Sequence, residues 1–172
     1  EDLVEEYRRL LGQCSRLRAV VPGGSTRQES VRNGVRALSP DCTLAAIHDG
    51  ARPLVTPEVF ARCIEAARNC GAATAAVPVK DTIKLADEAG RVLDTPDRSR
   101  LWAVQTPQIF DRERYLRAAE EAERRGLSCT DDCQLFEAMG WEVQLVMGDY
   151  RNLKLTTPED FLAAGAYLEG IK

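Results

Sequence analysis

The stretch "TLAAIHDGARPLVTPEVFARCIEAARNCGAATAAVPV", residues 43–79, decides the fold. Its first six residues and its last seven are apolar runs of the length and composition that strands have. Between them, Thr56, Pro57 and Glu58 supply a hydroxyl cap, a proline at the first helical position and an acid in the first turn. We therefore predict a helix from there to near Gly71. A strand, a helix and a strand in this order predict parallel strands joined by a right-handed crossover.

The segments on both sides continue the alternation of strands and helices. Before the stretch we expect a helix from the apolar spacing of residues 3–11, a strand at "LRAVV" (17–21), and a loop, "GGSTRQES" (23–30), that leads into a helix. After it we expect a strand at "LWAVQT" (101–106), a helix from Asp111 to Gly126, a short helix in "TDDCQLFEAMG" (130–140), strands at "WEVQLVMG" (141–148) and "NLKLT" (152–156), and a last helix opened by Thr157. The pattern predicts an α/β fold, a Rossmann-like three-layer sandwich with a mostly parallel sheet.

One segment interrupts this alternation. Residues 80–94, "KDTIKLADEAGRVLD", contain two short β-like runs around "DEAG", which is a hairpin signal. We expect a protruding β-hairpin arm within residues 80–102. No linker or internal repeat divides the chain, so residues 1–172 are expected to form a single domain.

Composition and charge limit the function classes. The net charge of −4 comes from 23 basic and 27 acidic residues that are mixed along the chain, which disfavours nucleic-acid binding. No apolar run approaches the roughly 20 residues of a membrane span, and the acidic start is unlike a secretory signal. The six cysteines include no C-x-x-C pair, so we expect reduced thiols and no zinc site. These features predict a soluble, cytoplasmic protein without a membrane partner.

The first candidate site lies at the end of the strand in residues 43–48. Ligands of such sheets bind at the carboxyl ends of the strands, where His48 and Asp49 are expected. Asp49 could coordinate a divalent cation, and Arg52 could orient it or bind a phosphate. The alternative is a structural Asp–Arg pair that fixes the loop.

Three further stretches are weaker candidates. Gly23 and Gly24 would let backbone N–H groups approach a ligand, with Ser30 near the start of the following helix, although a plain turn explains them as well. This loop is neither a P-loop nor G-x-G-x-x-G. Lys154 at the end of an expected strand would suit a phosphate or remain solvated. The acids in "TDD" (130–132) could bind metal or cap a helix.

Taken together, six segments resemble one known family. "GGSTRQESVRNGVRAL", "HDGARPLV", "PVKDTIK", "LWAVQTPQIF", "TDDCQLFEAMG" and "NLKLTTPEDF" occur in the order and approximate spacing seen in 2-C-methyl-D-erythritol 4-phosphate cytidylyltransferases. The resemblance covers most of the chain, from about Val20 to the end. It implies transfer of CMP from CTP to the acceptor, with release of pyrophosphate, in the non-mevalonate isoprenoid pathway. It also implies magnesium or another divalent cation and a homodimer joined through the arm.

The resemblance implies roles for individual residues that match the family's motifs. It places nucleotide contacts at Gly24, Ser25, Ser30 and Gly50. It places catalysis at Asp49, Arg52 and Lys154, with Asp49 also holding the metal. It places contacts with the acceptor at Thr106, Thr130 and Thr156 of one subunit and at Thr82 and Arg98 of a partner's arm. Ser25 stands where some relatives carry an acid, so base recognition there would rest more on backbone groups.

The chain departs from the family at its start, and this keeps other functions open. Residues 1–22 contain nothing like the strand and glycine-rich loop with which the family begins. We expect that a front portion precedes the chain; the alternative is a truncated, catalytically impaired CTP-binding or dimerisation module with little turnover. A ribitol-5-phosphate cytidylyltransferase is the nearest rival, although "KDTIK" and "DRSRLWAVQTPQ" favour the methylerythritol family. A dehydrogenase is disfavoured because no G-x-G-x-x-G follows a strand.

Overall fold

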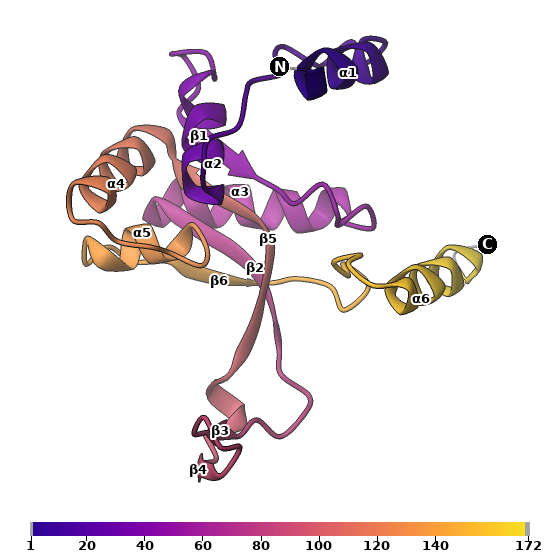
Figure 1. Cartoon of the computed structure of the whole chain (residues 1–172), viewed down its shortest axis with the longest axis vertical. Helices are drawn as coiled ribbons and strands as arrows, with labels where there is room; N and C mark the ends of the chain where they lie inside the picture. Colours follow the sequence, from indigo (N-terminus) through magenta and orange to yellow (C-terminus); the bar gives the residue numbers. More distant parts are fainter. Residues whose placement is uncertain (1, 171–172) are drawn as a thin grey trace.

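A computed structural model describes residues 2–170, which form a mixed α/β fold (Figure 1). The central sheet has the strand order β1-β5-β2-β6, with β1 Leu44–Ile47, β5 Trp102–Asp111, β2 Ala72–Pro78 and β6 Gln144–Met147. A separate two-stranded sheet contains β3 Leu85–Ala86 and β4 Val92–Asp94. The helices are α1 Asp2–Leu11, α2 Arg27–Arg36, α3 Pro57–Cys70, α4 Arg112–Arg124, α5 Cys133–Ala138 and α6 Pro158–Glu169, with a 3₁₀ turn at Arg98–Arg100.

The central sheet is mixed, which corrects the expectation of a mostly parallel sheet. β2 and β6 are parallel, but β5 runs antiparallel to both β1 and β2. The reason lies in the connection: the chain leaves β2, forms the hairpin of β3 and β4, and returns beside β2 without a crossover helix. Strands joined in this way have to be antiparallel.

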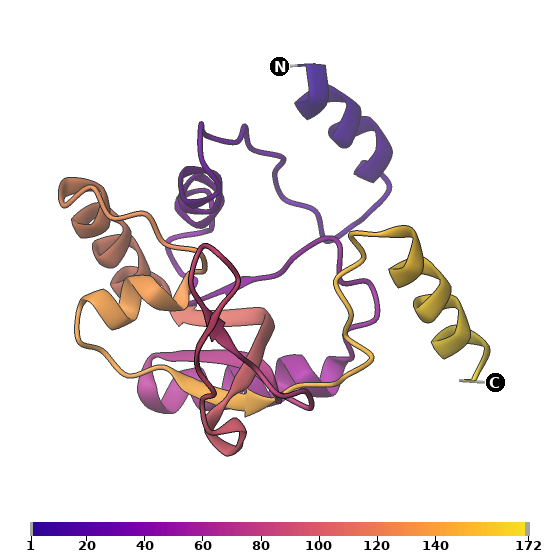
Figure 2. The ribbon, with the colours of Figure 1, turned by 60° about the horizontal axis from the view of Figure 1, so that its bottom comes forward.

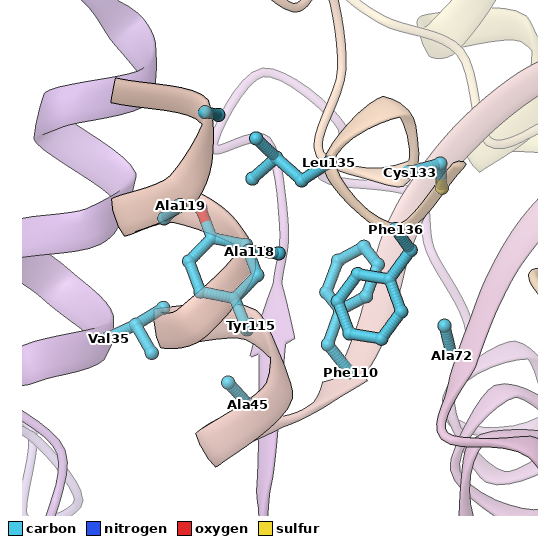
Figure 3. Packing of buried hydrophobic residues seen from close by; sticks show 11 residues of the cluster. Val35, Ala45, Ala72, Phe110, Tyr115, Ala118, Ala119, Cys133, Leu135 and Phe136 are labelled. Carbon is cyan, nitrogen blue, oxygen red and sulfur yellow. The ribbon is translucent and has the colours of Figure 1, made fainter. Parts of the chain in front are cut away.

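Helices cover both faces of this sheet, and each face has its own apolar core. In β5, Ile109 faces the core that it shares with Val59 and Cys63 of α3, whereas Phe110 faces the opposite way. Such alternation follows from the pleat of a strand. On the second face, the Phe110 ring lies 5.5 Å from Tyr115 of α4 and 4.9 Å from Phe136 of α5, measured between ring centroids (Figure 3). The layered sandwich is thus built around two apolar clusters.

The expected helix ends are confirmed where local chemistry specifies them. α3 begins at Pro57 and ends at Cys70, and it is capped by Gly71, whose φ of 93° lies in the left-handed region that favours glycine. The Asp111 carboxylate accepts a hydrogen bond from the backbone N–H of Arg114 and so caps α4. Thr56 occupies the N-cap position as expected, but its hydroxyl makes no hydrogen bond to the backbone of the first turn, so the side chain does not cap the helix.

Two expected strands, residues 17–21 and 152–156, are wrong. Neither pairs with another strand within residues 2–170, and an extended segment without a partner makes no ladder. Residues 152–156 instead form a loop in which the Leu155 N–H donates to the Ala51 carbonyl at 2.8 Å. This hydrogen bond holds residues 152–156 beside the loop that follows β1.

The cysteines form no disulfide bonds. The six thiols are free, and burial raises the pKa of Cys63 to about 11, so this thiol is neutral at ordinary pH.

Within the described residues, no helix has both the length and the apolar content to cross a bilayer. Both ends of the described chain lie on the side away from α4 (Figures 1 and 2).

One buried hydrogen bond gives a stability prediction. Tyr115 is fully buried, and its hydroxyl donates to Asp132 Oδ1 at 2.8 Å. Burial, together with the nearby Asp132 carboxylate, raises the pKa of Tyr115. Replacing Tyr115 by Phe should lower the free energy of unfolding by about 1–3 kcal/mol, because a buried carboxylate oxygen loses its donor. Urea denaturation measures this, with the exposed Tyr7→Phe as the control; equal stability of the two variants would contradict it.

Candidate active site

A cavity of about 370 Å³ lies beside the end of β1. Its walls come from β5, from the loops after β1 and β6, and from the turn before α5 together with α2. The lining residues are Arg27, Asp49, Arg52, Val104, Gln105, Thr106, Gln108, Thr130, Asp131, Gln134 and Lys154. The structure thus brings together six of the residues that the sequence pointed to, namely Asp49, Arg52, Thr106, Thr130, Asp131 and Lys154.

Asp49 is the centre of the charged groups in this cavity. Its Oδ2 lies 3.2 Å from Lys154 Nζ and 3.4 Å from Arg52 Nε. Burial by itself would raise the pKa of the Asp49 carboxyl, but the hydrogen bond from Lys154 and the charges of Lys154, Arg52 and Arg27 lower it below its ordinary value. Asp49 is therefore an anion at neutral pH, held between two cations.

His48 has a structural role in the same loop. The Asp49 backbone N–H donates to Thr106 Oγ1 at 3.0 Å, so the Thr106 hydroxyl proton is free to donate to His48 Nδ1 at 2.9 Å. With Nδ1 as the acceptor, the ring carries its proton on Nε2, which donates to the Arg52 carbonyl at 3.1 Å. His48 thus fixes the loop that presents Asp49.

A second set of hydrogen bonds joins this loop to residues 152–155, and the sequence did not indicate it. Arg52 donates to the Asn152 carbonyl at 2.8 Å. The Asn152 amide is fully buried and donates to the Thr106 carbonyl at 2.8 Å and to Gln105 Oε1 at 3.2 Å. Buried amides of this kind carry no signal in a single sequence. They explain why Lys154, which is distant in sequence, lies beside Asp49.

The carboxylates that line the cavity decide what it could offer a divalent cation. Asp49 supplies a carboxylate there, but both oxygens of Asp131 already accept hydrogen bonds, from Gln108 and from the Gln134 N–H. In the part of the chain that the structure describes, no group of three His, Cys, Asp or Glu residues could hold a metal by itself. Magnesium is commonly bound by one or two carboxylates, with phosphates and water completing its shell.

The glycine loop before α2 lies outside this cavity. The Gly24 N–H donates to Ser30 Oγ at 3.0 Å, and both the N–H and the hydroxyl of Ser25 donate to Glu29 Oε2. A Cβ on Gly24 would come within 2.3 Å of Glu29 Cβ, so the loop requires glycine there. These bonds support the reading of a turn that leads into a helix, and Gly50 likewise belongs to the turn after Asp49.

The remaining acceptor candidates are also placed elsewhere. The Thr156 hydroxyl donates to Asp160 at 3.1 Å, at the start of α6. Arg98 lies in the 3₁₀ turn that follows the hairpin and donates to the Lys80 carbonyl at 2.6 Å. Thr82 precedes β3 in the same segment. Thr156, Thr82 and Arg98 therefore do not line the cavity in one chain.

The fold and the cavity define a class of protein. An α/β sheet with a cation-rich cavity at the end of a strand is typical of enzymes that act on phosphorylated small molecules. Residues 1–170 match the family model described as "IspD: 2-C-methyl-D-erythritol 4-phosphate cytidylyltransferase". The chain belongs to this family.

Individual relatives and solved structures agree with that membership. The chain is 52% identical over 155 residues to the 2-C-methyl-D-erythritol 4-phosphate cytidylyltransferase of Desulforamulus reducens, an alignment that covers 90% of this chain and 66% of the relative. It is 53% identical over 149 residues to that of Caldanaerobacter subterraneus, covering 87% and 66%. The chain thus spans slightly less than two thirds of these relatives. The crystal structure of 4-diphosphocytidyl-2C-methyl-D-erythritol synthase from Anaerococcus prevotii superposes with a TM-score of 0.90 at 36% identity, covering 98% of this chain and 78% of that one.

Proposed function

We propose that the protein transfers CMP from CTP to 2-C-methyl-D-erythritol 4-phosphate and releases pyrophosphate. The products are 4-diphosphocytidyl-2-C-methyl-D-erythritol and pyrophosphate, within the non-mevalonate isoprenoid pathway. The observation that carries this proposal is the ionised Asp49 between Arg52 and Lys154, in a chain that belongs to the cytidylyltransferase family. The cavity's volume of about 370 Å³ lies within the range of small-molecule sites.

The cavity residues suit in-line attack of the acceptor phosphate on the α-phosphorus of CTP. Phosphoryl and nucleotidyl transfer depend mainly on positioning and on stabilising charge. Lys154 and Arg52 hold Asp49 ionised, and Lys154 is half-exposed toward the cavity, where it can meet a phosphate. A magnesium ion held by Asp49 would neutralise negative charge on the phosphates. Thr130 also lines the cavity; its hydroxyl oxygen accepts a hydrogen bond from the Gln134 amide at 2.8 Å, so its proton is left to donate to a phosphate oxygen.

We further propose that the arm joins two chains into a cytoplasmic homodimer, with residues 1–172 as a single nucleotidyltransferase domain. The segment of β3 and β4 extends away from the central sheet in Figure 1 and comes forward in Figure 2. Leu85, Val92 and Leu93 on it are exposed apolar side chains, which are typical of a surface that another chain covers. In an isologous pair, each arm would carry Thr82 and Arg98 to the cavity of its partner. The glycine loop with Gly24, Ser25 and Ser30, and Gly50 after β1, would then serve the nucleotide.

Arg98 gives a test of this composite site. Replacing Arg98 by Ala should raise the Michaelis constant for the acceptor by about tenfold, because one charge-assisted hydrogen bond to its phosphate is lost. Binding of CTP, measured by calorimetry, should stay unchanged. Arg91→Ala is the control, since Arg91 lies on the same arm and pairs with Asp87. An unchanged acceptor constant would argue against a site completed by the arm.

The acceptor is tested by measuring magnesium-dependent pyrophosphate release from CTP. Methylerythritol phosphate and ribitol 5-phosphate are compared at equal concentration with the same protein. We expect release with methylerythritol phosphate and little with ribitol 5-phosphate. Faster release with ribitol 5-phosphate would reassign the acceptor, and binding of CTP without release from either would indicate a non-catalytic module.

A further inference from the structure

A buried carboxylate lies directly behind the wall of the cavity. Asp132 is only 1% exposed, and each of its carboxylate oxygens has a partner inside the protein. Oδ2 forms an ion pair with Arg27 at 2.7 Å, and Oδ1 accepts a hydrogen bond from the Tyr115 hydroxyl at 2.8 Å. Its backbone N–H donates to the buried Gln108 side chain at 3.2 Å. A carboxylate is costly to bury unless it is paired in this way, so this group has a fixed position.

Arg27 connects this buried group to the cavity. The residue begins α2, and its side chain is 43% exposed although one nitrogen is bonded to Asp132. It lines the same cavity as Asp49 and Lys154, and its charge helps to lower the pKa of Asp49. A guanidinium has five N–H donors in a planar fork, so it can bond a carboxylate on one edge and an anion on another.

We propose that Arg27 binds a phosphate group in this cavity and that Asp132 and Tyr115 position its guanidinium. The inference rests on the proposed function for the identity of the phosphate, which belongs either to the acceptor or to CTP. Arg27 adds a third cation to a cavity in which Arg52 and Lys154 already face Asp49. An arginine fixed by a buried partner loses little side-chain entropy when it meets an anion.

Arg32 provides a matched comparison on the same helix. It also forms an ion pair across helices, with Glu123 of α4, but it does not line the cavity of Asp49. Both arginines therefore lose an ion pair when they are replaced by glutamine, and only Arg27 would also lose a ligand contact. The difference between the two variants isolates binding from stability.

The first experiment compares Arg27→Gln with Arg32→Gln by calorimetry and steady-state kinetics. We expect Arg27→Gln to lower the affinity for a phosphate-containing ligand by roughly tenfold or more. The probes are inorganic pyrophosphate, CTP and methylerythritol phosphate. Binding of cytidine, which carries no phosphate, should not change. A loss of affinity confined to methylerythritol phosphate would show that Arg27 binds the acceptor phosphate. A loss of affinity for CTP and pyrophosphate would show that Arg27 binds the phosphates of the nucleotide. Equal affinities in the two variants, or a parent that binds none of the phosphate probes, would overturn the proposal.

The second experiment tests the positioning by Asp132. Asp132→Asn keeps the shape and should reproduce the rise in the Michaelis constant of Arg27→Gln, with a smaller change in kcat. In the double variant the two effects should not add, because they act through one contact. A loss of stability with unchanged Michaelis constants would contradict the positioning role. If Asp132→Asn does not fold, Arg27→Lys replaces it in this test, because lysine keeps the charge but lacks the planar fork of donors. A Michaelis constant of Arg27→Lys equal to that of the parent would refute the positioning role of Asp132.

These measurements separate the inference from the proposed function. If the parent binds the phosphate probes but releases no pyrophosphate from CTP with either acceptor, the proposed reaction fails while the calorimetric test of Arg27 still stands. If the parent is active and Arg27→Gln matches Arg32→Gln in every constant, the reaction stands and the inference fails.

Discussion

Replacing Asp49 by Asn should lower the rate of pyrophosphate release by about 100-fold or more, while the protein stays folded. Asparagine has nearly the same shape and can still accept a hydrogen bond from Lys154, which lies 3.2 Å from the carboxylate. It has no charge, however, so it can neither hold a magnesium ion well nor balance Arg52 and Lys154 in the cavity. The turnover number from a coupled pyrophosphate assay measures the loss, and thermal unfolding monitors the fold.

Asp149→Asn is the matched control for that change. Asp149 is also paired with an arginine, Arg151, but it does not line the cavity. We expect the control to keep the activity of the parent. An Asp49→Asn variant as active as the parent would remove Asp49 from both the metal site and the transfer step.

Replacing Lys154 by Met should also reduce turnover by about 100-fold and change its pH dependence. The largest influence on the pKa of Asp49 is burial, which raises it, and Lys154 is the main group that offsets burial. In the parent, the stabilisation that an ionised Asp49 provides is present above the ordinary carboxyl pKa and is lost as the pH falls through its lowered folded pKa. Without Lys154 the folded pKa rises, so the residual activity should disappear at a higher pH on the acid side.

A pH–rate profile of the turnover number tests the second effect. Lys84→Met is the control, since Lys84 lies on the arm and bonds to Thr95. We expect its acid limb to coincide with that of the parent. An acid limb that is unchanged in Lys154→Met would show that Asp49 does not depend on Lys154 for its charge.

The sequence predicted the elements whose signals are local. Asp111 and Gly71 mark helix ends because a capping carboxylate and a left-handed glycine act within a few residues of themselves. The direction of β5 was missed, although the hairpin of residues 80–94 already implied that the chain turns back beside β2. "NLKLT" alternates like a strand, but the buried amide of Asn152 bonds to Thr106 and Gln105 and holds it in a loop.

The site was predictable in part for the same reason. Asp49 and Arg52 are close in sequence and meet in one loop. Lys154 was a phosphate candidate from its place at the end of an expected strand, and the resemblance to a known family pointed to it as well. Arg27 and Asp132 form an ion pair although they are 105 residues apart, and nothing in their local sequence indicates it. Contacts of this kind depend on the packing of α2 against the α4 and α5 layer, which appears only in three dimensions.

Phosphorus NMR of one reaction mixture tests the central proposal most directly. The mixture contains CTP, methylerythritol phosphate, magnesium and the protein, with the Asp49→Asn variant in a parallel sample. We expect the acceptor phosphate signal to disappear with the parent, while signals of a new diphosphate linkage and of free pyrophosphate grow in equal amounts. Unchanged signals of the acceptor and of the α-phosphate of CTP would contradict a role of this protein in CMP transfer.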